Sequence, residues 1–170
     1  MTLLRTIARL RVTLGFIGGA LALWLAHPTR GTLLAGGAVA LAGEAVRIWA
    51  AGHLEKGREV TSSGPYAWTR HPLYAGSTLI GLGLGFASAS VAVALMAIAY
   101  LAITLTAAVR TEEAHLTDKF GAAYPDYRAG LASGERRRFS LERGMRNREY
   151  RAVGGLLAAL AVFAWKARLF

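Results

Sequence analysis

The sequence predicts an all-α fold, a polytopic membrane helical bundle with four to five transmembrane helices. Of its 170 residues, 54% are hydrophobic and only 18% are charged, whereas a soluble domain carries about 25% charged residues. The apolar residues stand in long blocks, and a net charge of +10 gathers between those blocks. The chain has no cysteine, which excludes a disulfide framework, a thiolate metal site and a cysteine nucleophile.

The longest apolar block, from Leu73 to Val109, predicts a tight helical hairpin. Its 37 residues contain no formal charge. One helix of that length would measure about 55 Å, almost twice the hydrocarbon core of a bilayer. The block must therefore turn back, and Ser88–Ser90 is the place polar enough for a turn. We expect spans at about 73–88 and 91–109.

Two further spans are expected before the hairpin. Residues 12–26 form an apolar block, which the polar and Pro-containing stretch 27–31 ends. A second block at about 31–52 contains Glu44 and Arg47, three residues apart. Charged residues inside a span pair with each other or line a functional cavity. The two side chains are thus either a mutual structural pair or part of the wall of a substrate pocket.

The apolar stretch at 153–168 forms either a short fifth span or an interfacial helix. The basic residues set the orientation of the whole bundle. Three precede the first span, three lie at 53–72, ten lie at 110–151, and the hairpin tip has none. The positive-inside rule therefore predicts a multi-pass protein with the N-terminus and both basic segments in the cytoplasm.

Binding to nucleic acid is not needed to explain the net charge, because orientation bias and attraction to anionic lipid headgroups account for it. No pattern of stacking aromatics accompanies the basic residues. We expect the cluster Arg136-Arg137-Arg138 to touch lipid phosphates.

A polar motif at residues 63–76 precedes the hairpin. Gly64-Pro65 indicates a turn, and Pro72 suits the first turn of a helix. Arg70 and His71 then project at the N-terminal mouth of the third span, where free N–H groups favour an anion. The alternative is an interfacial aromatic anchor, made of Tyr66, Trp68 and Tyr74.

A second motif at residues 110–128 follows the hairpin and continues its second helix. The residues that recur on one helical face are Glu112, Leu116 and Phe120. Gly121 is a candidate C-cap, and we expect Pro125 to prevent further helix. The hairpin returns this motif to the same membrane face as Arg70 and His71. The alternative is a solvated helix end with an ordinary Arg110–Glu113 pair.

The two motifs resemble signatures of the isoprenylcysteine carboxyl methyltransferase family, which is related to the membrane phospholipid N-methyltransferases. The first reads Arg70-His71-Pro72-x-Tyr74-x-Gly76, preceded by Gly64-x-Tyr66. The second reads Glu112-Glu113-x-x-Leu116-x-x-x-Phe120-Gly121-x-x-Tyr124-x-x-Tyr127. The resemblance covers about residues 55–130 and implies an integral membrane enzyme that uses S-adenosylmethionine on the cytoplasmic side.

The resemblance also implies the site. Arg70, Glu112 and Glu113 are the expected catalytic residues, and which of the two glutamates contacts the cofactor stays open. The expected cofactor-binding residues are Tyr66, Arg70, His71, Pro72, Tyr74, Gly76, Glu112, Glu113, Leu116, Phe120, Tyr124 and Tyr127. Arginine suits the carboxylate of S-adenosylmethionine, an acid suits its ammonium, and aromatic rings suit its adenine. The histidines lack metal-ligand spacing, so no metal is expected.

The expected function is methyl transfer to a lipophilic or prenylated acceptor that enters from the bilayer. The family default is the carboxylate of a prenylcysteine-like substrate, and a phospholipid or another small lipophile is the alternative. An NADPH-dependent reductase of the sterol type and a non-enzymatic membrane adaptor are the rivals from other classes.

We expect one domain over residues 1–170. It comprises a catalytic core at about 55–130, a basic cytoplasmic segment at 131–151 and the apolar helix at 153–168. The last two extend past the second motif, where family members tend to end. Gly81-x-Gly83-x-Gly85 has no strand before it, so we expect it to serve close helix packing and not to bind a dinucleotide.

Overall fold

The computed structural model describes residues 2–131 and 137–168, and every element in these two ranges is helical. The elements are α1 (Thr2–Leu25), α2 (Arg30–His53), the 3-10 helix η1 (Gly64–Ala67), α3 (Pro72–Ala87), α4 (Val91–Phe120), α5 (Ala123–Arg128), α6 (Leu141–Arg146) and α7 (Tyr150–Lys166). The predicted all-α class is confirmed.

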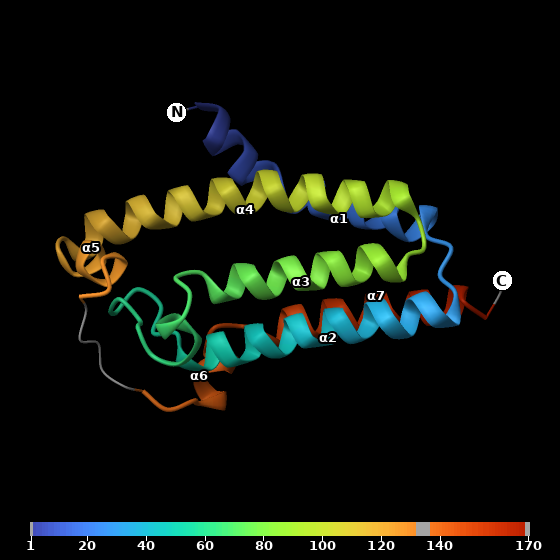
Figure 1. Cartoon of the computed structure of the whole chain (residues 1–170). Coiled ribbons are helices and arrows are strands. Elements are labelled where there is room, and N and C mark those ends of the chain that lie inside the picture. Colours follow the sequence, from blue (N-terminus) through green and yellow to red (C-terminus); the bar gives the residue numbers. More distant parts are fainter. Residues whose placement is uncertain (1, 132–136, 169–170) are drawn as a thin grey trace.

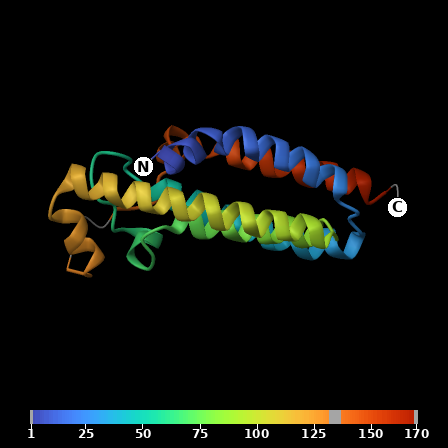
Figure 2. The same ribbon diagram turned by 90° about the horizontal axis from the view of Figure 1, so that it is seen from above.

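The long helices α1, α2, α3, α4 and α7 run alongside one another, as Figures 1 and 2 show from two sides. The short elements η1, α5 and α6 gather with their loops at one end, which we call the loop end. The chain turns at 26–29 and 88–90 at the opposite end, where the His27 N–H donates to the Ser88 carbonyl at 2.8 Å. The two sequence motifs therefore share the loop end.

The hairpin follows the predicted boundaries closely. α3 ends at Ala87, and Ser90 caps α4 by accepting from the Val93 N–H. α4 then continues to Phe120 and ends at Gly121, whose φ of +53° favours glycine. The expectation for Pro125 is wrong, because this residue lies inside the short helix α5. It occupies the first turn, where a missing N–H costs no hydrogen bond.

Two helices, α2 and α4, are long and apolar enough by length and composition to cross a membrane. Residues 15–25 of α1 and the whole of α3 form shorter apolar helices. The predicted count of four to five spans is therefore not confirmed. Large apolar side chains also point outward, and Phe16, Leu34 and Val91 are each at least 75% exposed. Such surfaces are typical of a protein in contact with lipid.

Glycines bring α2 and α3 into close contact. A Cβ added to Gly36 would lie 2.4 Å from the Gly83 carbonyl oxygen, and one added to Gly43 would lie 2.7 Å from the Gly76 carbonyl oxygen. Gly81 and Gly85 instead face Leu101 and Ala94 of α4. Small residues allow such close approach of membrane helices. The predicted packing role of the glycines at 81–85 is confirmed.

Candidate active site

A cavity of about 620 Å³ lies at the loop end, among α2, α3, α4 and the loop between α2 and α3. Its walls include all the residues predicted to bind the cofactor except Gly76 and Glu113, namely Tyr66, Arg70, His71, Pro72, Tyr74, Glu112, Leu116, Phe120, Tyr124 and Tyr127. The two motifs meet here because the α3–α4 hairpin folds the second back onto the first.

Glu113 joins the two basic residues that precede α3. Its Oε1 lies 3.2 Å from Arg70 Nη1 and 3.1 Å from His71 Nε2. The Arg70 side chain is 42% exposed, and exposed ion pairs contribute only about 0–1 kcal/mol. We call Arg70, His71 and Glu113 the mouth cluster. Because these contacts are weak in water, Arg70 can exchange its partner for a ligand.

Glu112 points into the cavity, away from Glu113. It accepts a hydrogen bond of 2.6 Å from the Tyr74 hydroxyl. Adjacent residues on an α-helix point in directions about 100° apart, so the two acids face different surroundings. Of the two adjacent acids, Glu112 lines the cavity and Glu113 does not.

Tyr124 and Tyr127 bring two phenols from α5 to the cavity. The Tyr127 hydroxyl donates to the Tyr66 carbonyl at 2.6 Å. Tyr124 is 3% exposed, and its buried hydroxyl lies beside the carboxylate of Glu113. Burial, followed by the interaction with the Glu113 carboxylate, raises the pKa of Tyr124 to about 12. Tyr124 therefore stays a neutral donor at physiological pH.

Arg47 of α2 forms part of the cavity wall, and the sequence motifs do not include it. Its Nε donates to Glu149 Oε1 at 2.7 Å, and its Nη1 donates to Ser77 Oγ at 2.5 Å. Glu44, the expected partner, forms a longer ion pair, with Oε2 3.9 Å from Arg47 Nε. Both alternatives left open by the sequence therefore apply to Arg47, which pairs with Glu44 and lines the pocket.

Gly76 lies outside the cavity wall, although the first motif includes it. A Cβ at this position would meet Arg47 Cγ at 2.5 Å and the Gly43 carbonyl oxygen at 2.6 Å. The missing side chain thus makes room for the stem of Arg47 and for the backbone of α2. Gly76 shapes the site indirectly.

The cavity residues that sequence reasoning missed lie mainly on the loop after α2 and on α4, with a few on α2 and just before α7. They include Glu55, Asn147 and Glu149. The charge of Arg47 inside an apolar block was a usable signal, and it led to the pocket alternative. Nothing local marks Glu149, because its partner stands 102 positions away along the chain.

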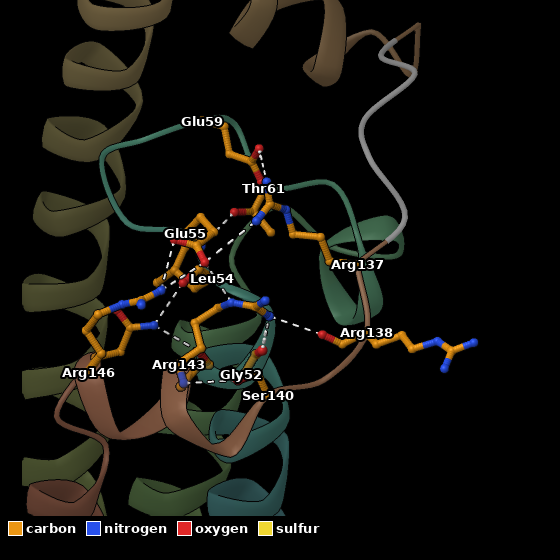
Figure 3. Close-up of polar contacts among 12 residues, drawn as sticks. Gly52, Leu54, Glu55, Glu59, Thr61, Arg137, Arg138, Ser140, Arg143 and Arg146 are labelled. Carbon is orange, nitrogen blue, oxygen red and sulfur yellow. Dashed lines mark hydrogen bonds and ion pairs between the residues drawn. The ribbon is translucent and has the colours of Figure 1, made fainter.

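A second group of charges fixes the chain after α5 onto α2. Glu55 is buried and accepts from Arg143 Nε at 2.8 Å and from Arg146 Nη2 at 2.9 Å, while Arg137 Nη1 lies 3.6 Å away (Figure 3). We call these four residues the Glu55 cluster. Burial opposes ionisation, but the hydrogen bond from Arg143 and the three positive charges outweigh it and hold the pKa of Glu55 below its ordinary value.

The Glu55 cluster corrects the expectation that Arg137 contacts lipid phosphates together with its neighbours Arg136 and Arg138. Arg137 also pairs with Glu59 through an Nη2–Oε2 distance of 2.8 Å, so it belongs to the protein's own ion pairs and is not a lipid-facing residue. Arg138 is exposed, and Arg136 lies outside the described residues. Contact with anionic lipid therefore stays a prediction for Arg136 and Arg138.

The helical bundle combines outward apolar surfaces with a cavity that both motifs line, as expected for a membrane enzyme. The sequence matches the phospholipid methyltransferase family over residues 10–123, about two thirds of the chain. The chain therefore belongs to this family of membrane methyltransferases. The match agrees with the predicted resemblance, because the isoprenylcysteine family is related to this one. Neither a curated protein nor a solved structure matches the sequence.

Proposed function

We propose that the chain transfers a methyl group from S-adenosylmethionine to a lipophilic acceptor that enters the cavity from the bilayer. The observation that carries this proposal is the meeting of both motifs at one cavity, where Arg70, Glu112 and Tyr124 all line the wall. Family membership supports methyl transfer as the reaction. Family membership therefore favours a methyltransferase over an NADPH-dependent reductase and over a non-enzymatic adaptor.

The chemistry of the cavity wall fits S-adenosylmethionine. Arg70 would take the carboxylate of the cofactor in place of its exposed contact with Glu113. Glu112 is the better of the two acids for the ammonium, because it lines the cavity while Glu113 pairs outside it. Phe120 and Tyr124 offer faces for the adenine ring.

Catalysis in such a site rests on position and on exclusion of water. When bound, S-adenosylmethionine supplies the activated methyl group. Arg70 and Glu112 would fix the orientation of the bound molecule, so that the acceptor lies in line with the bond that breaks. The apolar walls from Leu116 and Phe120 would remove water from the attacking atom and raise its reactivity. The chain would therefore act mainly by alignment and desolvation.

Three acceptor classes fit this proposal. The carboxylate of a prenylcysteine-like substrate is the default of the resembled family, and a phospholipid is equally compatible with the matched family. A small lipophile is a third candidate within the same chemistry. The cofactor end of the cavity is common to all three.

The proposal includes a topology of four or five spans, with α1, α3 and, in the larger count, α7 added to α2 and α4. The positions of the basic segments support a cytoplasmic N-terminus, loop end and cavity. A reporter fused after residue 60 or 135 should be cytoplasmic, and one at 88–90 external. A cytoplasmic hairpin tip would contradict the orientation and the site.

The decisive experiment is calorimetry on detergent-solubilised protein with S-adenosylmethionine and NADPH in separate titrations. We expect saturable binding of S-adenosylmethionine and none of NADPH. The reverse result would indicate a reductase, and binding of neither would indicate an adaptor. Transfer of a labelled methyl group to dioleoyl phosphatidylethanolamine and to N-acetyl-S-farnesylcysteine then distinguishes the acceptor classes.

A further inference from the structure

We propose that Arg47 forms a second subsite of the cavity, where it donates a hydrogen bond to an oxygen in the polar group of the acceptor. Glu149 is the positioning residue that orients Arg47. This inference rests on the proposed function, because it assigns the acceptor to the part of the cavity wall that α2 contributes. The acceptor side of the cavity then uses residues that neither motif includes.

The guanidinium of Arg47 has protein acceptors for two of its three nitrogens. Its Nε donates to Glu149 at 2.7 Å, and its Nη1 donates to Ser77 at 2.5 Å and to the Leu73 carbonyl at 3.4 Å. None of the described residues accepts a hydrogen bond from Nη2. The side chain lines the cavity and keeps 20% exposure. Its orientation is therefore fixed while one pair of N–H donors stays available to a ligand.

The charges around Arg47 indicate which chemistry it would recognise. Glu149 balances the guanidinium at hydrogen-bond distance, and Glu44 adds a second carboxylate at 3.9 Å. The subsite thus offers directed N–H donors without a net positive charge. A neutral hydrogen-bond-accepting oxygen meets this requirement, such as an ester carbonyl of a phospholipid or the amide carbonyl of an N-acylated prenylcysteine.

The depth of Arg47 suits a molecule that arrives from the bilayer. Arg47 stands six residues before the end of α2, and Ser77 stands five residues after the start of α3. At 1.5 Å per residue, both lie about 8–9 Å from the helix ends that face the loop end. Arg70 and His71 precede α3 and are therefore shallower. An acceptor would reach the Arg47 wall before it reaches the mouth cluster.

The positioning residue comes from outside the part of the chain that matches the family. The match ends at residue 123, whereas Glu149 stands between α6 and α7. This junction is fixed on α2, because the Asn147 side chain donates to the carbonyls of Ala51 and Leu54, both at 2.9 Å. The junction is therefore a rigid support for Glu149 and part of the cavity wall.

Four variants of the full chain test the inference: Glu149→Gln, Arg47→Gln, the double variant, and Glu142→Gln as the matched control. Glu142 lies on the same segment, is exposed and lines no part of the cavity. Native mass spectrometry of detergent-solubilised protein measures binding of dioleoyl phosphatidylethanolamine and N-acetyl-S-farnesylcysteine. Calorimetry with S-adenosylmethionine runs in parallel on every variant.

We expect Glu149→Gln to weaken binding of at least one probe by on the order of tenfold, the scale of one charged hydrogen bond. Binding of S-adenosylmethionine and the behaviour of the Glu142→Gln control should stay unchanged. The probe that loses affinity identifies the source of the oxygen. The double variant should bind no more weakly than Arg47→Gln, because Glu149 acts through Arg47.

Three results would overturn the inference. They are normal probe binding by Glu149→Gln, additive losses in the double variant, and a parent protein that binds S-adenosylmethionine but neither probe. Equal losses of cofactor and probe binding would assign Arg47 to the cofactor and count against an acceptor subsite. A parent that binds no S-adenosylmethionine contradicts the proposed function instead, so the two failures are distinguishable.

Discussion

The mouth cluster and the Glu55 cluster use the same residue types in opposite environments. In the mouth cluster, the Arg70 side chain is 42% exposed and that of Glu113 is 25% exposed. In the Glu55 cluster, the values are 9% for Glu55 and 15% for Arg143. An exposed pair is weak and exchanges partners readily, whereas breaking a buried one leaves a charge without compensation. The first arrangement suits ligand binding, and the second suits the fixing of a chain segment.

The largest effect should follow from removing the charge at the centre of the Glu55 cluster. Glu55→Gln leaves Arg143 and Arg146 without a carboxylate, so we expect a loss of about 3 kcal/mol in the free energy of unfolding. Thermal unfolding in detergent measures the loss, with Glu142→Gln as control. An unfolding midpoint equal to that of the control would show that the cluster does not stabilise the fold.

Substitutions of the two adjacent glutamates should weaken binding of S-adenosylmethionine to different extents. Glu112→Gln should cost about 1.5–3 kcal/mol of binding free energy, the range for a hydrogen bond to a charged group. Glu113→Gln should cost less, because Glu113 pairs outside the cavity. Calorimetry on both variants checks the order. If even the double Gln variant binds as tightly as the parent, neither acid holds the ammonium.

Arg70→Lys should be nearly as damaging to cofactor binding as Arg70→Ala, with a loss of about 1.5 kcal/mol, because lysine cannot reproduce the planar fork of arginine. Arg138→Lys is the matched control, since Arg138 is exposed and its expected contact with lipid needs only charge. Intact cofactor binding with lost turnover would move Arg70 to the acceptor. Normal binding and turnover would remove it from the site.

The stability of the folded protein should also depend on pH through the ionisation of Glu55, and this effect should be smaller. The pKa of Glu55 is lower in the folded protein than in the unfolded chain. Its stabilising contribution is therefore complete above pH 4.5 and is lost as the pH falls through the folded value. Unfolding midpoints of the parent and of Glu55→Gln should converge on acidification. Parallel curves at all pH values would contradict this.

The smallest effect should come from the tyrosine that joins α5 to η1. Tyr127→Phe removes the hydrogen bond to the Tyr66 carbonyl and should lower the free energy of unfolding by about 1 kcal/mol. The aromatic ring stays, so binding of S-adenosylmethionine should change little. Thermal unfolding and calorimetry together test this, and a large loss of binding would give the hydroxyl a direct role.

The sequence predicted well what depends on neighbouring residues. The turn at Ser88–Ser90, the helix start at Pro72 and the cap at Gly121 follow from local backbone chemistry. The meeting of the two motifs followed from the folded-back hairpin alone. Pro125 failed as a helix breaker because a new helix started just before it.

Contacts that join distant positions gave no comparable signal. Glu55 and Arg143 stand 88 positions apart, and Arg47 and Glu149 stand 102 apart. A basic segment attracted to lipid and a basic segment paired with buried acids have the same composition. The exposed and buried clusters therefore become distinguishable only when the fold supplies their surroundings.

The glycine contacts between α2 and α3 limit how the cavity can widen. A Cβ at Gly36 or Gly43 would overlap the backbone of α3, so the two helices have no side-chain layer in which to slide apart. We therefore expect the two helices to move together. Widening of the cavity would then separate α4 from this pair, on the side that Thr104, Ala107 and Thr111 line. A long hydrocarbon chain would enter on that side without breaking the α2–α3 contact.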